Sequence, residues 1–183
     1  MLDLKFFKLF LFKPFMNKYY SLLARYLVLV LVAIPNLWLF YLIFTPFTVY
    51  PVYFLLDIFF AVSLTKTTLF LGIDTIKIIS ACVAGSAYYL LLILNLTTPN
   101  IKKRAQSIFF AFSLLLLVNI LRIVLFAVLF HYRAPFFNFT HQLSWYFLSI
   151  IFVIAIWFYE VKLFKIKDIP IYTDIKLLIQ QSQ

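Results

Sequence analysis

The chain has 183 residues, of which 66% are hydrophobic and only 12% are charged, and it contains just two glycines. A soluble domain is about half apolar and about a quarter charged, so the composition excludes a water-soluble globule and indicates an integral membrane protein with one domain over residues 1–183. The formal net charge of +10 does not indicate nucleic-acid binding, because the basic residues flank apolar segments and form no basic face on a water-exposed fold.

The N-terminal segment is both basic and apolar. Residues 6–15, "FFKLFLFKPF", alternate lysines with aromatic residues, and we expect them to form a short amphipathic helix along the inner membrane interface. No A-x-A-like cleavage site closes the apolar region, so we expect residues 1–25 to be a retained cytoplasmic or interfacial end and not a removed signal peptide.

A membrane span needs about 20 mostly apolar residues, and four segments are the clear candidates: Tyr26–Phe44, Cys82–Leu96, Ser107–Leu129 and Leu143–Tyr159. Val52–Leu64 is a weaker candidate because it is short and carries Asp57. Either it is re-entrant or interfacial, or there is a further crossing that the sequence does not locate. The number of spans before Cys82 therefore stays open.

A β-like stretch follows the weak candidate. "TTLFLGIDTIKIIS" is rich in β-branched residues, with Gly72 and Asp74 at an expected turn, which predicts a short hairpin. The expected fold is an all-α, multi-span helical bundle with an extracellular β-like hairpin before Cys82.

The distribution of basic residues predicts the orientation of the second half. Lys102, Lys103 and Arg104 interrupt the middle of the chain, and such clusters mark the cytoplasmic side. Cys82–Leu96 is then expected to run inward and Ser107–Leu129 outward. His131–His141 becomes an external loop, and residues 161–183 a cytoplasmic tail.

Three reactive side chains are predicted at one depth. Cys82 lies 20 residues before Lys102, and Arg122 lies 20 residues after it. On antiparallel helices equal counts mean equal depth, about 30 Å from the turn at 1.5 Å per residue. His141 starts the next segment from the same side. The thiol, the guanidinium and the imidazole should therefore meet near the outer face.

Arg122 is the most informative of these residues. It lies within "FSLLLLVNILRIVLFAVLF", where a charge costs about 2.5–3.5 kcal/mol on insertion scales. Asn119, three residues earlier, shares its helical face and is expected to orient it or to line the same cavity. Each residue also has an ordinary explanation alone: Arg122 can reach the outer headgroups, Cys82 can be an inert thiol, and His141 can be interfacial.

The combination suits acyl transfer. A nearby cation favours the thiolate, and a histidine takes its proton. An arginine beside the nucleophile stabilises the oxyanion of a tetrahedral intermediate. One cysteine and two histidines support neither a disulfide framework nor a Cys/His metal site, and no Walker-type loop or dinucleotide fingerprint occurs, so we expect no cofactor and no metal.

The ordered set of motifs resembles the exosortase/archaeosortase family. A Cys at the outer start of one span, "NILRI" (Asn119 to Ile123) in the next and a His about twenty residues later carry the resemblance, which covers residues 71–157. The short, phenylalanine-rich chain looks more like the small archaeal members, among them the pacearchaeosortase group. One departure is "CVAG", with Gly85 third after the Cys, where the family usually has C-S-G.

The resemblance implies a multi-pass cell-membrane cysteine transpeptidase with its active site at the extracellular face. Its substrates would be surface proteins ending in a short motif, a transmembrane helix and a basic cluster. The acyl group would pass to an acceptor such as a lipid amine. Cys82 would be the nucleophile, Arg122 the oxyanion-stabilising group and His141 the general base and acid. Asn119, Ser86 and Arg133 are supporting candidates, with Arg133 the reserve for His141, because some members use an arginine in its place.

Two other functions compete with this interpretation. The first is a small non-enzymatic membrane component for transport or assembly, with Arg122 contacting lipid phosphate or substrate. The few glycines and the scarcity of intramembrane charges count against a transporter. The second is a lipid-modifying acyltransferase that uses the same thiol.

Overall fold

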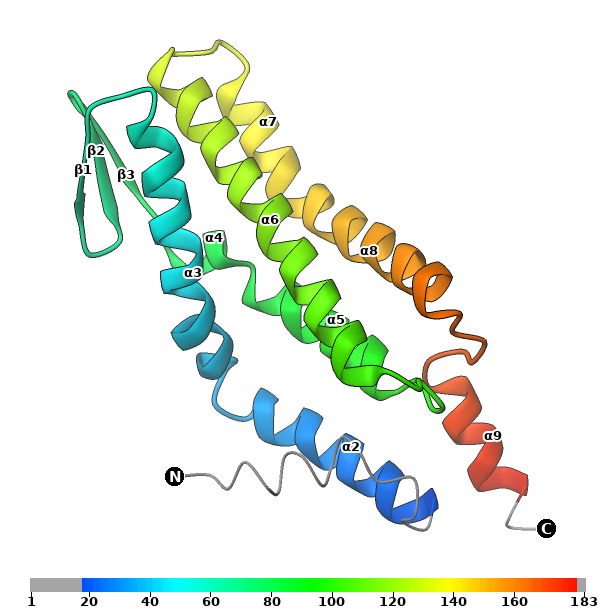
Figure 1. Ribbon diagram of the computed structural model, residues 1–183. Coiled ribbons are helices and arrows are strands. Elements are labelled where there is room, and N and C mark those ends of the chain that lie inside the picture. The colour runs from blue at the N-terminus through cyan, green and yellow to red at the C-terminus, as the bar shows by residue number, and fades with distance from the viewer. Residues whose placement is uncertain (1–17, 181–183) are drawn as a thin grey trace.

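The structure is a computed structural model that describes residues 18–180. The amphipathic helix expected over residues 6–15 lies outside the described residues. The described chain is mostly helical, with one small sheet at one end of the helices (Figure 1). The principal helices are α2 (Lys18–Ala33), α3 (Trp38–Asp57), α5 (Gly85–Leu96), α6 (Arg104–His131), α8 (Ser149–Phe164) and α9 (Tyr172–Gln180).

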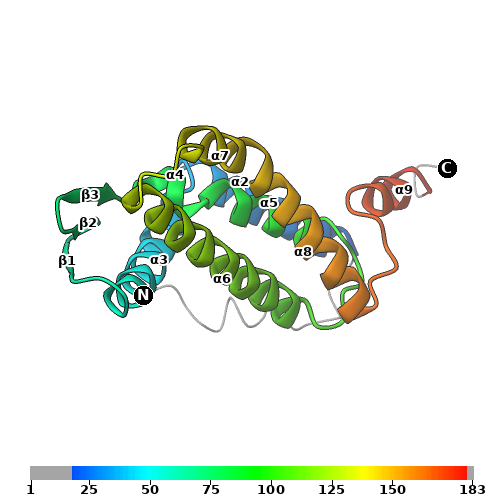
Figure 2. The same ribbon diagram turned by 90° about the horizontal axis from the view of Figure 1, so that it is seen from above.

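α6 is the centre of the helical layer. It packs against α3, α5 and α8, and the view from above shows these helices gathered around it (Figure 2). One group of buried residues joins α3, the sheet and the C-terminal half of α6. A second group joins α3, α5, α8 and the N-terminal half of α6, and it includes the stacked rings of Phe44 and Tyr88, 3.8 Å apart.

The first expected span, Tyr26–Phe44, is wrong as a continuous helix. α2 ends at Ala33 and α3 begins at Trp38, with a turn between them in which Asn36 and Leu37 have φ values of 49° and 60°. Pro35 has no N–H to continue a helix and disfavours helical geometry in the residue before it. The apolar pattern continues across this break, which is why the composition did not reveal it.

Val52–Leu64 is not one segment either. It is divided between the end of α3 and β1 (Val62–Thr65), and β2 (Thr68–Leu71) and β3 (Asp74–Lys77) complete an antiparallel sheet in the order β1-β2-β3. The hairpin expected before the cysteine is confirmed as β2–β3, with Gly72 at φ 59° in its turn. The first strand, β1, was not expected.

The helix expected over Cys82–Leu96 is broken near its start. Cys82 lies in a single turn, α4 (Ser80–Val83), and Ala84 at φ 60° separates this turn from α5. Gly85 begins α5 where the Tyr41 ring approaches closely, since a Cβ on Gly85 would lie 2.7 Å from Tyr41 Cε1. The close approach of Tyr41 therefore explains why position 85 is a glycine, the residue at which the chain departs from the C-S-G pattern.

The two later segments are helical as expected. Ser107–Leu129 lies within α6. Leu143–Tyr159 lies within an unbroken helical run formed by α7 (Phe137–Leu143), a π-helical turn η1 (Ser144–Leu148) and α8. The residues at both junctions keep right-handed helical angles, so the run continues from Phe137 to Phe164. The loop that was expected to be external is accordingly shorter than expected, ending where α7 begins.

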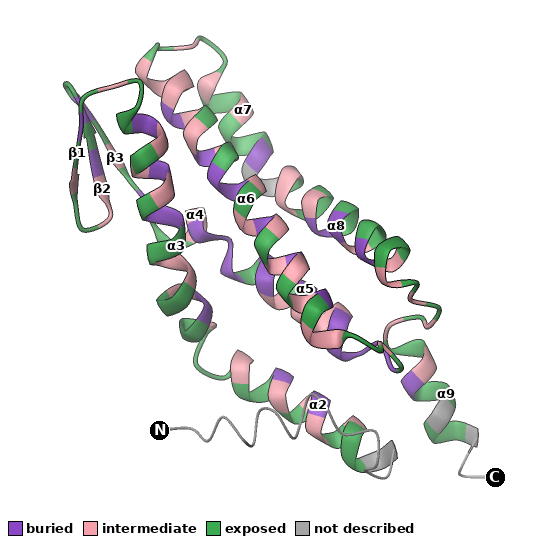
Figure 3. Ribbon diagram, in the orientation of Figure 1, coloured by how far each residue is buried: buried purple, intermediate pink, exposed green. Residues whose placement is uncertain are grey.

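The surface of the helices is strongly apolar. α3 and α6 are each long and apolar enough to cross a membrane, and only 28% of the apolar window of each is buried. Exposed positions alternate with buried ones along the helices (Figure 3). On α6 the exposed side chains include Leu117, Leu121 and Leu125, each more than half exposed. Core helices of soluble proteins are not exposed in this way.

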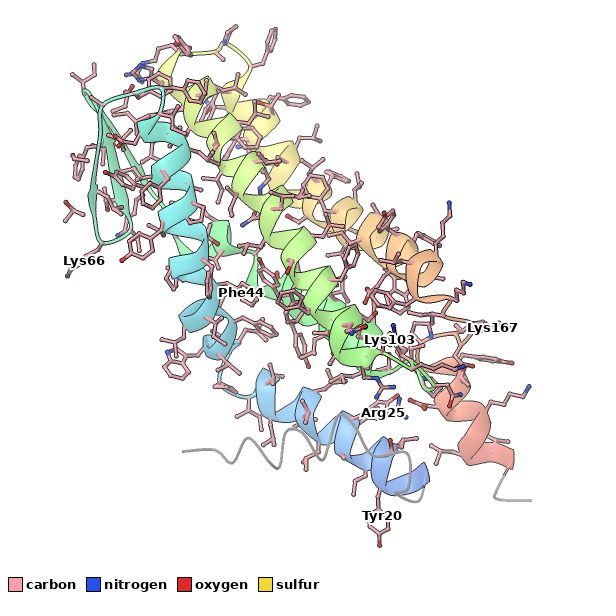
Figure 4. All side chains as sticks on the ribbon, in the orientation of Figure 1. Tyr20, Arg25, Phe44, Lys66, Lys103 and Lys167 are labelled. Atoms are coloured by element: carbon pink, nitrogen blue, oxygen red, sulfur yellow. The ribbon has the colours of Figure 1, made fainter. Side chains whose placement is uncertain are left out.

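Charge is divided unequally between the two ends of the bundle. Arg25, Lys103 and Lys167 lie at the end opposite the sheet, whereas Lys66 lies at the tip of the sheet (Figure 4). Asp57 and Asp74 belong to the sheet end and offset its few basic residues. The excess of positive charge is therefore at the end where α5 leads into α6.

Candidate active site

One cavity contains the three reactive side chains expected from the sequence. Its volume is about 350 Å³, and Cys82, Arg122 and His141 all line it. The walls come from β3 and the residues after it, from α4, from the C-terminal half of α6 and from the α7–η1 segment. Segments far apart in the sequence are thus brought to one place.

Backbone contacts fix the position of Cys82. Its N–H donates to the Ile79 carbonyl at 2.9 Å, which closes the α4 turn. Its own carbonyl accepts a hydrogen bond from Asn119 Nδ2 at 2.8 Å. The thiol is partly exposed and has no hydrogen-bond partner among residues 18–180. The backbone is held from two sides while the sulfur stays accessible from the cavity.

Asn119 has a different role from the expected one. It is on the same side of α6 as Arg122, but it is buried, with 2% of its surface exposed, and its amide contacts the Cys82 backbone. It therefore positions the nucleophile candidate and not the arginine. A buried amide donor that lost this acceptor would cost about 1–3 kcal/mol.

Arg122 reaches the cavity from the middle of α6. Its Nη1 donates to Ser149 Oγ on α8 at 3.0 Å, and the side chain lines the same cavity as Cys82. A guanidinium has five N–H donors, and this is its only side-chain hydrogen bond within the described chain. Donors therefore remain for a ligand in the cavity.

His141 lies near the end of α7 and close to the start of the helical run from Phe137 to Phe164. Its ring stacks on Phe137 at 5.4 Å and meets the edge of Phe126 at 5.3 Å. Within the described residues it makes no hydrogen bond to Cys82. Catalytic hydrogen bonds are often long in an empty site and form only with substrate present, so the shared cavity is the relevant observation.

Arg133, the expected alternative to His141, lies outside the cavity. It donates to Asp74 Oδ1, while His131 Nδ1 lies 2.9 Å from Asp74 Oδ2. Asp74 is buried at the turn between β2 and β3, so both contacts attach the sheet to the end of α6. Arg133 does not line the cavity. Ser86 is exposed on α5 and does not line it either.

One residue of this site was not predicted from the sequence. Ser144 lines the cavity from η1, and its buried hydroxyl has no partner in the described chain. It follows His141 by three residues, a spacing that places two residues on one helical face and that the sequence already contained. A π-helical turn is also a feature often found at functional sites, but no pattern in the sequence predicted this one.

The chemistry of the lining favours anions. Lys77 and Arg122 are cationic, the lining contains no carboxylate, and the remaining wall is largely isoleucine and phenylalanine. No group of three or more His, Cys, Asp or Glu side chains in the described chain is arranged to hold a metal ion. The cavity therefore offers a nucleophile, a base and a fixed cation in mostly apolar surroundings, where electrostatic stabilisation of an oxyanion is strong.

Comparison with known protein families, curated proteins and solved structures finds no match for this chain.

Proposed function

We propose that this chain is a membrane-embedded cysteine transpeptidase that cleaves the C-terminal sorting signals of surface proteins. The observation that carries the proposal is the lining of one cavity by Cys82, Arg122 and His141 from three separate elements. A lone buried cysteine is usually inert, and an arginine alone can contact lipid headgroups. Their convergence with a histidine in one cavity favours a catalytic role over a structural one.

Each residue has a role in the proposed reaction. His141 removes the Cys82 proton, and the thiolate attacks the carbonyl carbon of the scissile peptide bond. Arg122, with the free hydroxyl of Ser144, stabilises the oxyanion. The tetrahedral intermediate collapses to a thioester as the leaving amine takes the proton from His141. An acceptor amine then attacks the thioester, forms the new amide and returns the proton to Cys82.

The proposed membrane arrangement has four crossings, by α3, the α4–α5 segment (Ser80–Leu96), α6 and α8. α3 and α6 satisfy the length and hydropathy requirements individually, and the continuous run from α7 to α8 supplies a third long helix. The positive end of the bundle is cytoplasmic by the positive-inside rule. In this proposed arrangement α3 is the first outward crossing, so the sheet and the cavity face outward.

The deciding experiment compares the surface proteins of cells that carry Cys82→Ala with those of wild-type cells. We expect proteins that end in a transmembrane helix and basic cluster to accumulate uncleaved, with enzyme level and insertion unchanged. Cys82→Ser should be nearly as inactive, because a hydroxyl is far less acidic than a thiol. Normal cleavage in Cys82→Ala cells would end the proposal.

A matched control is available on the next helix. The double variant Cys82→Ala with Ser86→Cys keeps one thiol in the chain but moves it to an exposed position outside the cavity. It should remain inactive, which would show that the cavity and not the thiol alone supports the reaction. Mass analysis of the acyl group trapped on Cys82 separates a peptide from a fatty acyl chain, and a fatty acyl chain would favour a lipid-modifying acyltransferase.

A further inference from the structure

We propose that β3 is a docking strand, on which the peptide substrate adds as a fourth, parallel strand that leads its scissile bond to Cys82. This inference rests on the proposed function, and it specifies how an extended peptide is recognised. The observation behind it is a free strand edge that continues directly into the cavity containing the nucleophile.

The pairing register shows which backbone groups of β3 are free. Ile78 N–H donates to the Thr67 carbonyl, and the β2–β3 register keeps the same pairing along both strands. Because hydrogen-bonded pairs alternate in an antiparallel ladder, Asp74, Ile76 and Ile78 face β2. The N–H and C=O groups of Thr75 and Lys77 point to the outer edge, and neither residue has a backbone partner within the described chain.

The two outer edges of the sheet differ in how far other parts of the protein cover them. On β1, the Val62 N–H donates to Asp57 Oδ1 at 3.2 Å, and α3 packs beside the strand. Natural sheets usually cover or block their edges, because an open edge is a template for pairing. The β3 edge stays open, and residues from Thr75 to Ile79 line the cavity together with Cys82.

The direction of β3 determines the direction of the peptide. The strand runs from Asp74 toward α4 and Cys82 (Figure 1). In a substrate whose transmembrane tail follows the cleavage site, the chain runs from the outer solution toward the membrane, which is the same direction. Residues before the scissile bond therefore pair in parallel with Thr75 and Lys77. Strand addition of this kind provides affinity through the main chain, while alternate side chains provide specificity.

The cavity wall suggests what those side chains are. Phe126, Phe130 and Phe137 line the same cavity as Thr75 to Ile79, so a peptide docked on β3 lies beside an aromatic surface. Apolar or aromatic side chains at alternate positions of the peptide would bury surface there. The intervening positions would face away and tolerate polar residues.

The first test changes one backbone donor. Thr75→Pro removes the edge N–H without touching the β2 ladder, and proline is tolerated on edge strands. Thr75→Ala is the matched control, because it loses the side chain but keeps the N–H. The substrate is a protein that accumulates uncleaved in Cys82→Ala cells. We expect Thr75→Pro to slow its cleavage about ten-fold or more, and Thr75→Ala to cleave nearly normally.

Alkylation of Cys82 by iodoacetamide shows whether the variant site is intact. Unchanged alkylation with slowed cleavage in Thr75→Pro supports docking, and normal cleavage by Thr75→Pro overturns it. If no protein accumulates in Cys82→Ala cells, the proposed function fails and the docking strand fails with it. Accumulation there, combined with normal cleavage by Thr75→Pro, refutes the docking strand alone.

Hydrogen exchange gives a second test that needs no change in β3. The probe is a synthetic peptide of the residues preceding the mapped cleavage site, added to the Cys82→Ala protein. The Thr75 and Lys77 amides should gain protection, whereas the Leu64 amide, on the outer edge of β1 by the same alternation, should not change. Equal exchange at Thr75 with and without bound peptide would overturn the proposal even if Thr75→Pro disturbs the fold.

Discussion

Two regions of the molecule each contain an arginine within the helical bundle, and the two guanidinium groups differ in how many of their N–H donors are hydrogen-bonded. At the basic end, Arg25 donates to the Ser21 and Leu96 carbonyls and pairs with Asp174 at 2.8 Å. Its side chain is 6% exposed, and that of Asp174 is 2% exposed. Near the sheet, Arg122 makes one side-chain hydrogen bond, to Ser149, beside a thiol and a serine hydroxyl with none.

The difference separates a structural cation from an available one. Arg25 connects α2, the end of α5 and α9, and three of its five N–H donors are used by the protein. Arg122 faces a cavity with donors left over. Arg25 is buried whereas Arg122 is only half-buried, and the count of satisfied donors separates the two residues in the same way.

The largest effect we expect concerns the two ends themselves, because the proposed topology places them on opposite sides of the membrane. Cysteines introduced as Lys103→Cys and Asn138→Cys, each in the Cys82→Ala background, occupy exposed positions at the two ends. An impermeant thiol reagent applied to intact cells should label position 138 and not position 103. The opposite labelling would reverse the proposed orientation.

The next effect is on stability at the basic end. Arg25→Met leaves Asp174 buried without its partner, which typically costs about 3–5 kcal/mol. We expect a clear fall in the melting temperature of the detergent-solubilised protein. The double variant Arg25→Met with Asp174→Leu should recover much of that loss, since no lone charge remains. An unchanged melting temperature in Arg25→Met would show that the pair is not structural.

The smallest effect should be on activity alone. Arg122→Lys keeps the charge but loses the planar set of donors. We expect at least about a ten-fold loss of activity, equivalent to about 1.4 kcal/mol in the barrier, with no change in melting temperature. Full activity in Arg122→Lys would return Arg122 to the role of a headgroup-binding residue.

The sequence predicted the later helices and the hairpin well, because each depends on local signals. α6 is a long apolar segment bounded by Lys103 and the polar loop after His131, and the β2–β3 turn has its glycine. The break before α3 was missed although Pro35 and Asn36 are turn-forming residues, because the apolar pattern continues on both sides of them. The break at Ala84 was missed because this residue adopts a positive φ without being glycine.

The convergence of the reactive residues was predicted for a partly incorrect reason. Counting from Lys102 assumed continuous helices on both sides, but Cys82 lies beyond a break in the chain. The thiol reaches the cavity because α4 is held to Asn119, a tertiary contact that no count reveals. The role of Ser144 and the attachment of Arg133 to Asp74 depend in the same way on packing between distant segments.

The pairing of Asp74 with His131 and Arg133 has a consequence for the order in which the protein is made. These contacts join residues 57 and 59 positions apart, whereas the sheet itself is built from neighbouring strands. The hairpin can pair as soon as it leaves the ribosome, but its buried carboxylate has no partner until α6 is complete. The last wall of the cavity arrives still later, with His141 and Ser144. A nascent chain therefore carries its thiol for about 60 residues of synthesis before the last residues that line the cavity are made.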